Sequence, residues 1–253
     1  IRQLYRPPIP GVIAFLLVFI WQGLGHTVMI LMEKILGAEY VYHSSFVIGA
    51  ISIWMIWYGR NKSEFAATMW GFTGGSLLWT TWVEFWFHLY ARVLDIAPVV
   101  ASAKIVKPEY VLMPAVTGMT LVTLVHFLFN KDTRCNAFMW IQRALNMDMG
   151  PRNSGKDRNI AMLVATETIY VTLFCYLLLL FTYMTGEQSW FTYSVFVLNF
   201  IWALYLIPRM LKFARMAPAL RYAIPTAIIL WNCVEIMGRW ALFTEIWVHP
   251  EKY

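Results

Sequence analysis

The chain has 253 residues, of which 60% are apolar, 13% are charged and 17% are aromatic, and its formal net charge is +6. Water-soluble domains are about 45–50% apolar and about 25% charged, so this composition excludes a soluble enzyme and also a disordered chain. The basic residues lie between apolar runs, which argues against a nucleic-acid partner. A lipid bilayer is the solvent that remains, and the 13 Trp and 13 Tyr residues suit its interfaces.

Apolar segments long enough to be membrane-spanning helices recur along the chain, since a span needs about 20 residues. We predict an all-α, polytopic membrane bundle of about seven transmembrane helices, which forms a single integral membrane domain over residues 1–253. The segments cover residues 11–32, 42–59, 65–91, 110–130, 159–185, 189–207 and 219–247. The first has no A-x-A-like cleavage site, so we expect a retained helix rather than a signal peptide.

Lysine and arginine residues are concentrated on alternate connections between these segments. The minor set consists of Lys34, Arg92, Lys104, Lys107 and Lys252. Arg239 lies inside the seventh segment, and all the other basic residues fall on the opposite set of connections. Because basic connections stay in the cytoplasm, the N-terminus is predicted to be cytoplasmic and the C-terminus to lie outside. The expected location is a bacterial inner membrane, either cytoplasmic or intracytoplasmic.

Residues 131–158 form the longest predicted cytoplasmic connection. Within it, Phe138, Ile141 and Leu145 recur at helical spacing beside Trp140 and Arg143. This pattern predicts a short amphipathic helix that lies on the inner membrane surface. Anchoring is its simplest role, and docking of a partner subunit is the alternative.

Ionisable residues inside the predicted spans are costly in hydrocarbon, so each of them needs a reason. The orientation places one group in the outer half of the bilayer or at its outer boundary: His26, His43, Glu84, His88, Glu235 and Arg239. Glu167 and His126 fall in the inner half and are candidate proton-relay groups. A bis-histidine haem is not expected there, because no second histidine lies at the depth of His126.

The spacing within the outer group leaves two interpretations open. Glu84 and His88 are four residues apart, so they share one face of a helix and suit either two ligands of one metal or a hydrogen-bonded pair. Together with His26 and His43 they form a candidate metal site, whose imidazoles favour copper, iron or zinc over magnesium. Glu235 and Arg239 have the same spacing, which predicts an internal ion pair.

One stretch carries a family resemblance. Residues 22–49 contain Gln22-x-x-x-His26-Thr27, Met32-Glu33, and then His43 before Phe46-Val47-Ile48-Gly49. This stretch resembles the metal-binding helix pair in a membrane subunit of the copper membrane monooxygenases, the particulate methane and ammonia monooxygenase family, which has Asn where Gln22 stands. Gly238-Arg239-Trp240 resembles the closing helix of another subunit of those enzymes. The resemblance implies copper as the favoured metal, with Gln22, His26 and His43 as ligands and Glu33 as a carboxylate beside them.

These observations lead to three functional hypotheses. The first is a membrane subunit of a multi-subunit redox complex, a copper-dependent monooxygenase that acts on a small apolar substrate and takes electrons from a quinol or a donor protein. The second is a non-catalytic structural subunit of a respiratory or photosynthetic complex. The third is a proton- or ion-coupled transporter with a 3+1+3 layout, in which Glu84, Glu167 and Glu235 relay protons or cations.

Overall fold

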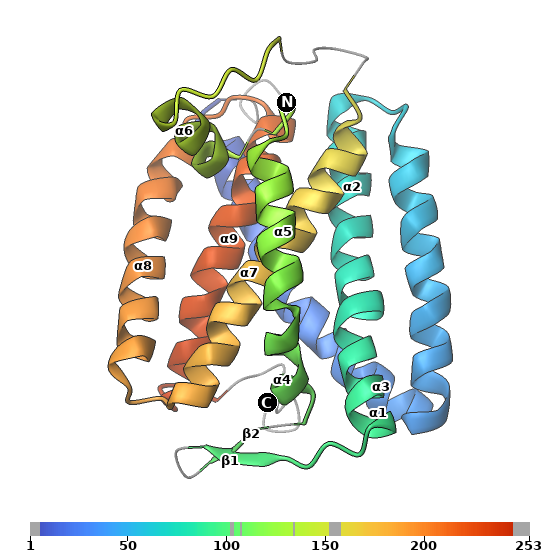
Figure 1. The fold of residues 1–253 in the computed structure, drawn as a ribbon. Coiled ribbons are helices and arrows are strands. Elements are labelled where there is room, and N and C mark those ends of the chain that lie inside the picture. The colour runs from blue at the N-terminus through green and yellow to red at the C-terminus, as the bar shows by residue number, and fades with distance from the viewer. Residues whose placement is uncertain (1–5, 102–103, 107, 134, 152–157, 245–253) are drawn as a thin grey trace.

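The computed structural model describes residues 6–101, 104–106, 108–133, 135–151 and 158–244, which form a bundle of helices with one short β-hairpin (Figure 1). The long helices are α1 (Ile9–Gly59), α7 (Ile160–Thr185), α8 (Trp190–Met210) and α9 (Met216–Arg239). The shorter helices are α2 (Glu64–Leu78), α3 (Phe85–Val93), α4 (Pro108–Leu112), α5 (Thr117–Leu128) and α6 (Asn136–Ala144). The hairpin, which the sequence did not predict, pairs β1 (Val99–Ala101) antiparallel with β2 (Lys104–Val106).

Five helical segments within the described residues are long and apolar enough to cross a membrane: Ile9–Gly37, Glu39–Gly59, Ile160–Thr185, Trp190–Met210 and Met216–Arg239. They match the first, second, fifth, sixth and seventh predicted segments. The prediction of an all-α, multi-pass membrane protein is thereby confirmed. The last helix ends at Arg239, well before the predicted end at residue 247, and residues 245–247 lie outside the described part.

The first two spans are joined without a loop. The sequence predicted a connection over residues 33–41, but α1 is helical on both sides of Gly37, which alone leaves the helical conformation (φ 68, ψ 173). Glycine reaches this left-handed region at no steric cost, so it can reverse the chain within one residue. The first half of α1 (dark blue) crosses the bundle obliquely, and the second half returns along its edge (Figure 1).

The third predicted span is interrupted by a π-helical turn. Residues Trp79–Glu84 are wound more widely than an α-helix, and they separate α2 from α3. Such turns insert one extra residue and rotate the chain that follows, which is why they are common at functional sites. Trp82 from this turn donates a hydrogen bond to the carbonyl of Phe46 (3.1 Å) and fills the space beside Gly49. The turn is thus fixed against the second half of α1.

The fourth predicted span is shorter than expected. A 3-10 turn (Met113–Val116) leads from α4 into α5, and the apolar helical stretch covers Met113–Leu128. On the same side of the fold as the N-terminus, α6 occupies Asn136–Ala144, within the segment where the sequence predicts an amphipathic helix. Its Phe138 packs against Phe127 and Tyr170, while Trp140 is exposed.

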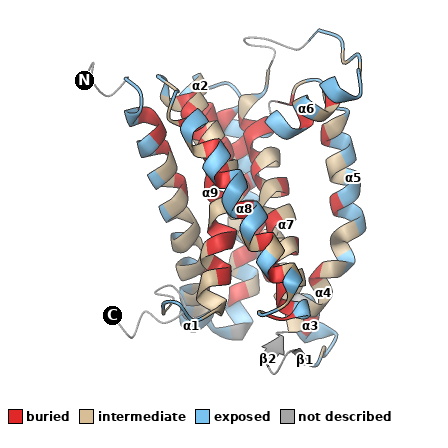
Figure 2. Ribbon diagram, turned by 90° about the vertical axis from the view of Figure 1, so that its left-hand side faces the viewer, coloured by how far each residue is buried: buried red, intermediate tan, exposed pale blue. Residues whose placement is uncertain are grey.

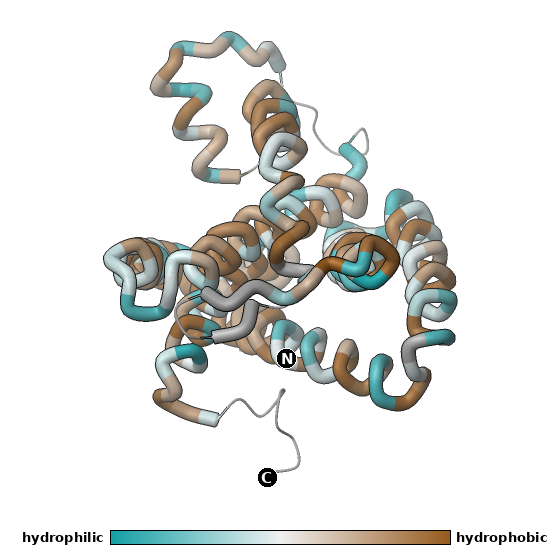
Figure 3. The backbone as a smooth tube through the Cα atoms, turned by 60° about the horizontal axis from the view of Figure 1, so that its bottom comes forward, coloured by the Kyte–Doolittle hydropathy of each residue, from teal (hydrophilic) through white to brown (hydrophobic). Residues whose placement is uncertain are grey.

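The core lies around α7 and α9, where buried residues (red) gather, whereas α5 and α8 expose much of their surface (Figure 2). Small residues allow α2 to approach α7 closely: Gly71 lies against the backbone of Ala161, and Gly75 against that of Ala165. This is the packing that membrane helices use in the absence of a hydrophobic driving force. Hydrophobic stretches (brown) also cover helices at the edge of the bundle, as expected for surfaces that face lipid (Figure 3).

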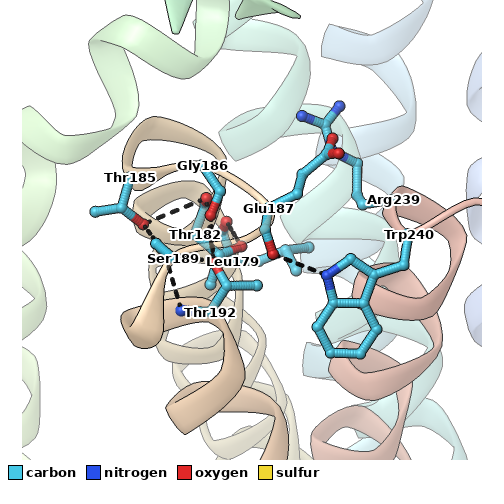
Figure 4. A network of polar contacts seen from close by, with 9 residues as sticks. All are labelled: Leu179, Thr182, Thr185, Gly186, Glu187, Ser189, Thr192, Arg239 and Trp240. Carbon is cyan, nitrogen blue, oxygen red and sulfur yellow. Dashed lines mark hydrogen bonds and ion pairs between the residues drawn. The ribbon is translucent and has the colours of Figure 1, made fainter. Parts of the chain in front are cut away.

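Ion pairs tie the helix ends together at both ends of the bundle. At the N-terminal end of α2, Arg221 of α9 donates to Glu64 (2.6 Å) and to Thr68 (3.0 Å). At the opposite end, Glu187 from the α7–α8 turn pairs with Arg239 Nε (3.1 Å), and its carbonyl accepts from Trp240 Nε1 (2.8 Å; Figure 4). The end of α9 is therefore attached to a polar turn rather than left free.

Alanine at Gly75 should destabilise the bundle, because its Cβ would lie 2.8 Å from the Cα and carbonyl oxygen of Ala165. We expect Gly75→Ala to lower the free energy of unfolding by about 1–3 kcal/mol, the usual cost of overpacking. Titration with a denaturing detergent measures this. Gly118→Ala is the matched control, because a Cβ there meets open space. Equal stability of the two variants would contradict the close packing of α2 on α7.

The Glu64–Arg221 pair predicts a loss of stability in acid. The hydrogen bond from Arg221 is the main reason why the pKa of Glu64 is held below its usual value, and Arg215 and Arg158 add attraction. Because the folded-state pKa is the lower one, the stabilisation is complete above the unfolded-state pKa and disappears as the pH falls through the folded-state pKa. Glu64→Gln should lower the unfolding temperature at neutral pH by a few degrees at most, since a half-exposed pair contributes about 1 kcal/mol or less. The difference should vanish in acid, and a difference that persists there would contradict this assignment.

Candidate functional site

An imidazole–carboxylate pair, of which the carboxylate is buried and the imidazole about one-third exposed, joins α1 to α9. His26 Nε2 lies 3.3 Å from Glu235 Oε1, and the indole of Trp231 donates a hydrogen bond to the same oxygen (2.7 Å). The His26 ring stacks on the Trp231 ring at a centroid distance of 6.1 Å. Only 8% of Glu235 is exposed, so its carboxylate depends on these two partners.

A second pair joins α1 to α3. His88 Nδ1 lies 3.1 Å from Glu33 Oε1, about two helical turns further along α1 than His26. The Glu33 side chain is about half exposed and the His88 side chain is largely covered. The oblique first half of α1 therefore carries two acid–base contacts, one to α9 and one to α3.

Glu84 lies at the end of the π-helical turn, with only 7% of its surface exposed. The hydroxyl of Tyr176 on α7 donates a hydrogen bond to it (3.1 Å). Glu84 also interacts electrostatically with His26, His88 and Glu235. It is thus the central carboxyl between the two pairs. We refer to Glu33, His88, Glu84, Tyr176, His26 and Glu235 as the His–Glu cluster.

The cluster contains only part of the expected metal site. His43 is exposed, and its Nδ1 contacts the carbonyl of Glu39 in its own helix (2.9 Å). Gln22 makes no hydrogen bond to the cluster within the described chain. In the same part of the chain, no three His, Cys, Asp or Glu side chains converge closely enough to hold a metal ion. The imidazoles of His26 and His88 face different carboxylates, so a copper site formed by them stays a prediction from the sequence.

The remaining predicted residues lie outside the cluster. Arg239 pairs with Glu187 (3.1 Å), while Glu235 contacts His26 and Trp231; Arg239 acts on Glu235, its predicted partner, as an electrostatic attraction rather than through a close ion pair. Near the α6 end of the bundle, Glu167 accepts a hydrogen bond from buried Thr133 (3.2 Å). His126 on α5 borders a cavity at that end.

The sequence analysis missed two residues of the site, Tyr176 and Trp231. Both are aromatic residues in aromatic-rich spans, where packing is the simplest interpretation, and Tyr176 acquires its acidic partner, Glu84, only through a tertiary contact. A signal existed for Trp231 alone, since it stands four residues before Glu235 and so shares its helix face.

No protein-family model matches this chain, and neither a curated protein nor a solved structure is significantly similar to it. The resemblance of residues 22–49 to the copper membrane monooxygenases therefore stays a prediction from the sequence. What the geometry itself provides is a set of paired acids and bases in an apolar surrounding, which can hold and exchange protons.

Replacing His26 should cost far more stability than replacing His43. His26→Ala removes one of the two contacts that the described residues make to the buried Glu235 carboxylate, which should cost about 1–3 kcal/mol. His43→Ala removes an exposed ring and should change the stability by about 0.5 kcal/mol or less. Denaturing-detergent titrations of both variants measure the difference. Equal losses would contradict the pairing of His26 with Glu235.

Proposed function

We propose that the protein is a proton-coupled membrane transporter, in which the His–Glu cluster binds and releases the coupling protons. The single observation that carries this proposal is Glu84, a buried carboxyl placed between the pairs His26–Glu235 and Glu33–His88. Ionisable groups at membrane depth are expensive, and those that persist there serve most often as proton or ion sites.

The positions of basic residues support an orientation for the cluster. The proposal keeps the seven predicted spans by taking the α2–α3 and α4–α5 stretches as two crossings in addition to the five long apolar helices. Several of the basic residues used for the orientation lie outside the described part of the chain. They include Arg2, Lys107, Arg134, Arg152, Lys156 and Lys252. With the N-terminus in the cytoplasm, the cluster lies in the outer half of the bilayer. The membrane itself stays as predicted, a bacterial inner membrane.

A proton can move through the cluster in steps between neighbouring acids and bases. Glu33, near the outer end of the first span, is the most exposed member, and its carboxyl can pass a proton to His88 (3.1 Å). His88 then returns to its neutral form when it protonates Glu84, four residues before it. Each step exchanges one proton between a carboxylate and an imidazole, and no other reactant is needed.

The contacts around Glu84 also support coupling rather than a continuous channel. Tyr176 holds Glu84 from α7, but toward the α6 end the same helix presents the apolar Leu173 and Ile169 before Glu167 is reached. A continuous chain of titratable groups would dissipate a proton gradient. An interruption by apolar side chains leaves room for a conformational step between the two sides.

The alternatives make different demands on the same residues. A copper-dependent redox subunit would need His26 and His88 to leave their carboxylates and turn toward one metal. A non-catalytic structural subunit would use the cluster only to fix helices, and its properties would not change when Glu84 becomes uncharged. Stoichiometric copper, iron or zinc in the purified protein would favour the redox subunit over the transporter.

A rapid change of external pH should move charge into the protein if the cluster is open to the outer side. We expect vesicles that carry the protein, adsorbed on a supported membrane, to give a transient current after an external pH jump. Glu84→Gln should reduce this current to that of protein-free vesicles, because the central proton acceptor is lost.

The matched control for this experiment is Glu39→Gln, which changes an exposed carboxylate at the start of the second span, two residues after Gly37. Its current should equal that of the unsubstituted protein. A full transient in Glu84→Gln, or no transient in the unsubstituted protein, would overturn the proposal.

A further inference from the structure

A cavity of about 530 Å³ opens between α5 and α7 at the α6 end of the bundle, separate from the His–Glu cluster. Its volume is typical of sites that bind small molecules. The outer face of α5 is apolar and exposed, with Leu121, Val122 and Val125 among its residues. A lipid molecule could therefore enter this cavity sideways from the bilayer.

The charged side chains of the cavity wall, Asp132 and Arg158, lie at its α6 end. Asn130 and Asp132 follow the C-terminal end of α5, and Arg158 precedes α7, so these polar groups lie at the mouth. Phe127, Leu163 and Leu173 supply apolar wall, and the hydroxyls of Thr123 and Thr166, which also line the cavity, donate to carbonyls of their own helices. A charged end with a largely apolar wall beside it suits a molecule with a polar head and an apolar chain.

Arg158 and Asp132, which carry opposite charges, both line the cavity, as does His126. The Nε and Nη2 atoms of Arg158 are covered by protein and its charge also attracts Glu64, so the guanidinium forms part of the wall. Asp132 supplies a carboxylate to the same wall. Its backbone N–H donates a hydrogen bond to Asn130 Oδ1 (2.9 Å). A guanidinium selects a phosphate, and a carboxylate selects an ammonium group.

We propose that this cavity binds a phospholipid with a phosphoethanolamine head, whose phosphate contacts Arg158 and whose primary ammonium contacts Asp132. The acyl chain then lies along Phe127 and Leu163. A choline head has no N–H to donate to Asp132, and a glycerol head brings no positive charge to it. The cavity therefore discriminates among lipids by the head rather than by the chain, independently of any role of the His–Glu cluster.

Native mass spectrometry of the delipidated full chain tests this binding. The probes are phosphatidylethanolamine, phosphatidylcholine and phosphatidylglycerol with identical acyl chains. We expect one phosphatidylethanolamine per chain, bound about tenfold more tightly than either of the others, as the loss of one charge-assisted hydrogen bond implies. Equal retention of the three lipids would overturn the proposal, and so would retention of a free fatty acid or quinone in preference to all of them.

Two substitutions separate recognition of the head from general damage to the fold. Arg158→Gln should weaken binding of phosphatidylethanolamine about tenfold, since it removes the charge opposite the phosphate. Asp132→Asn should keep binding but abolish the preference for phosphatidylethanolamine over phosphatidylglycerol, a change that misfolding does not imitate. Lys131→Gln, an exposed neighbour outside the wall, is the control and should alter nothing. An unchanged preference in Asp132→Asn would contradict the proposed contact.

Discussion

Ionisable side chains inside a bilayer must neutralise one another, and this requirement determines how α1 crosses the bundle. Each unpaired charge at membrane depth costs at least about 2.5 kcal/mol. His26 meets Glu235 and Glu33 meets His88, so the first half of α1 can only lie obliquely, toward α9 and then α3. Gly37 makes this path compatible with the second half, because it reverses the chain at once and lets Glu39–Gly59 stand beside α2.

The π-helical turn and the ion pairs at the bundle ends complete this arrangement. The turn places Glu84 where Tyr176 can donate to its carboxyl, while Trp82 fastens the turn to the second half of α1. Glu64 with Arg221 and Glu187 with Arg239 hold α9 at its two ends, outside the cluster. Protonation of the central titratable groups can then change the contacts between helices, while the ion pairs at the helix ends keep the helices folded.

The helices were predictable from the sequence, but the contacts between them were not. Runs of apolar residues determine where spans occur, and the shared depth of His26, Glu84, His88 and Glu235 followed from those spans alone. Which imidazole meets which carboxylate depends on helix tilt, and the tilt depends on the backbone of Gly37 and on the extra residue in Trp79–Glu84. His43 shows the same limit, because it shares the depth of the cluster and yet faces its own helix.

Cysteine cross-linking tests the crossing of α1 over α9 most directly. In protein with Cys135, Cys175 and Cys233 replaced by serine, His26→Cys together with Glu235→Cys should be joined in native membranes by a short bifunctional methanethiosulfonate reagent, since the two native side chains meet at their tips (3.3 Å). A direct disulfide needs closer Cβ atoms than a contact between side-chain tips provides, so the reagent bridges the gap. Mass spectrometry of the linked peptides identifies the bond. His43→Cys with Glu235→Cys should give no such product. Efficient linkage of the second pair, or none in the first, would contradict the placement of α1 on which the His–Glu cluster depends.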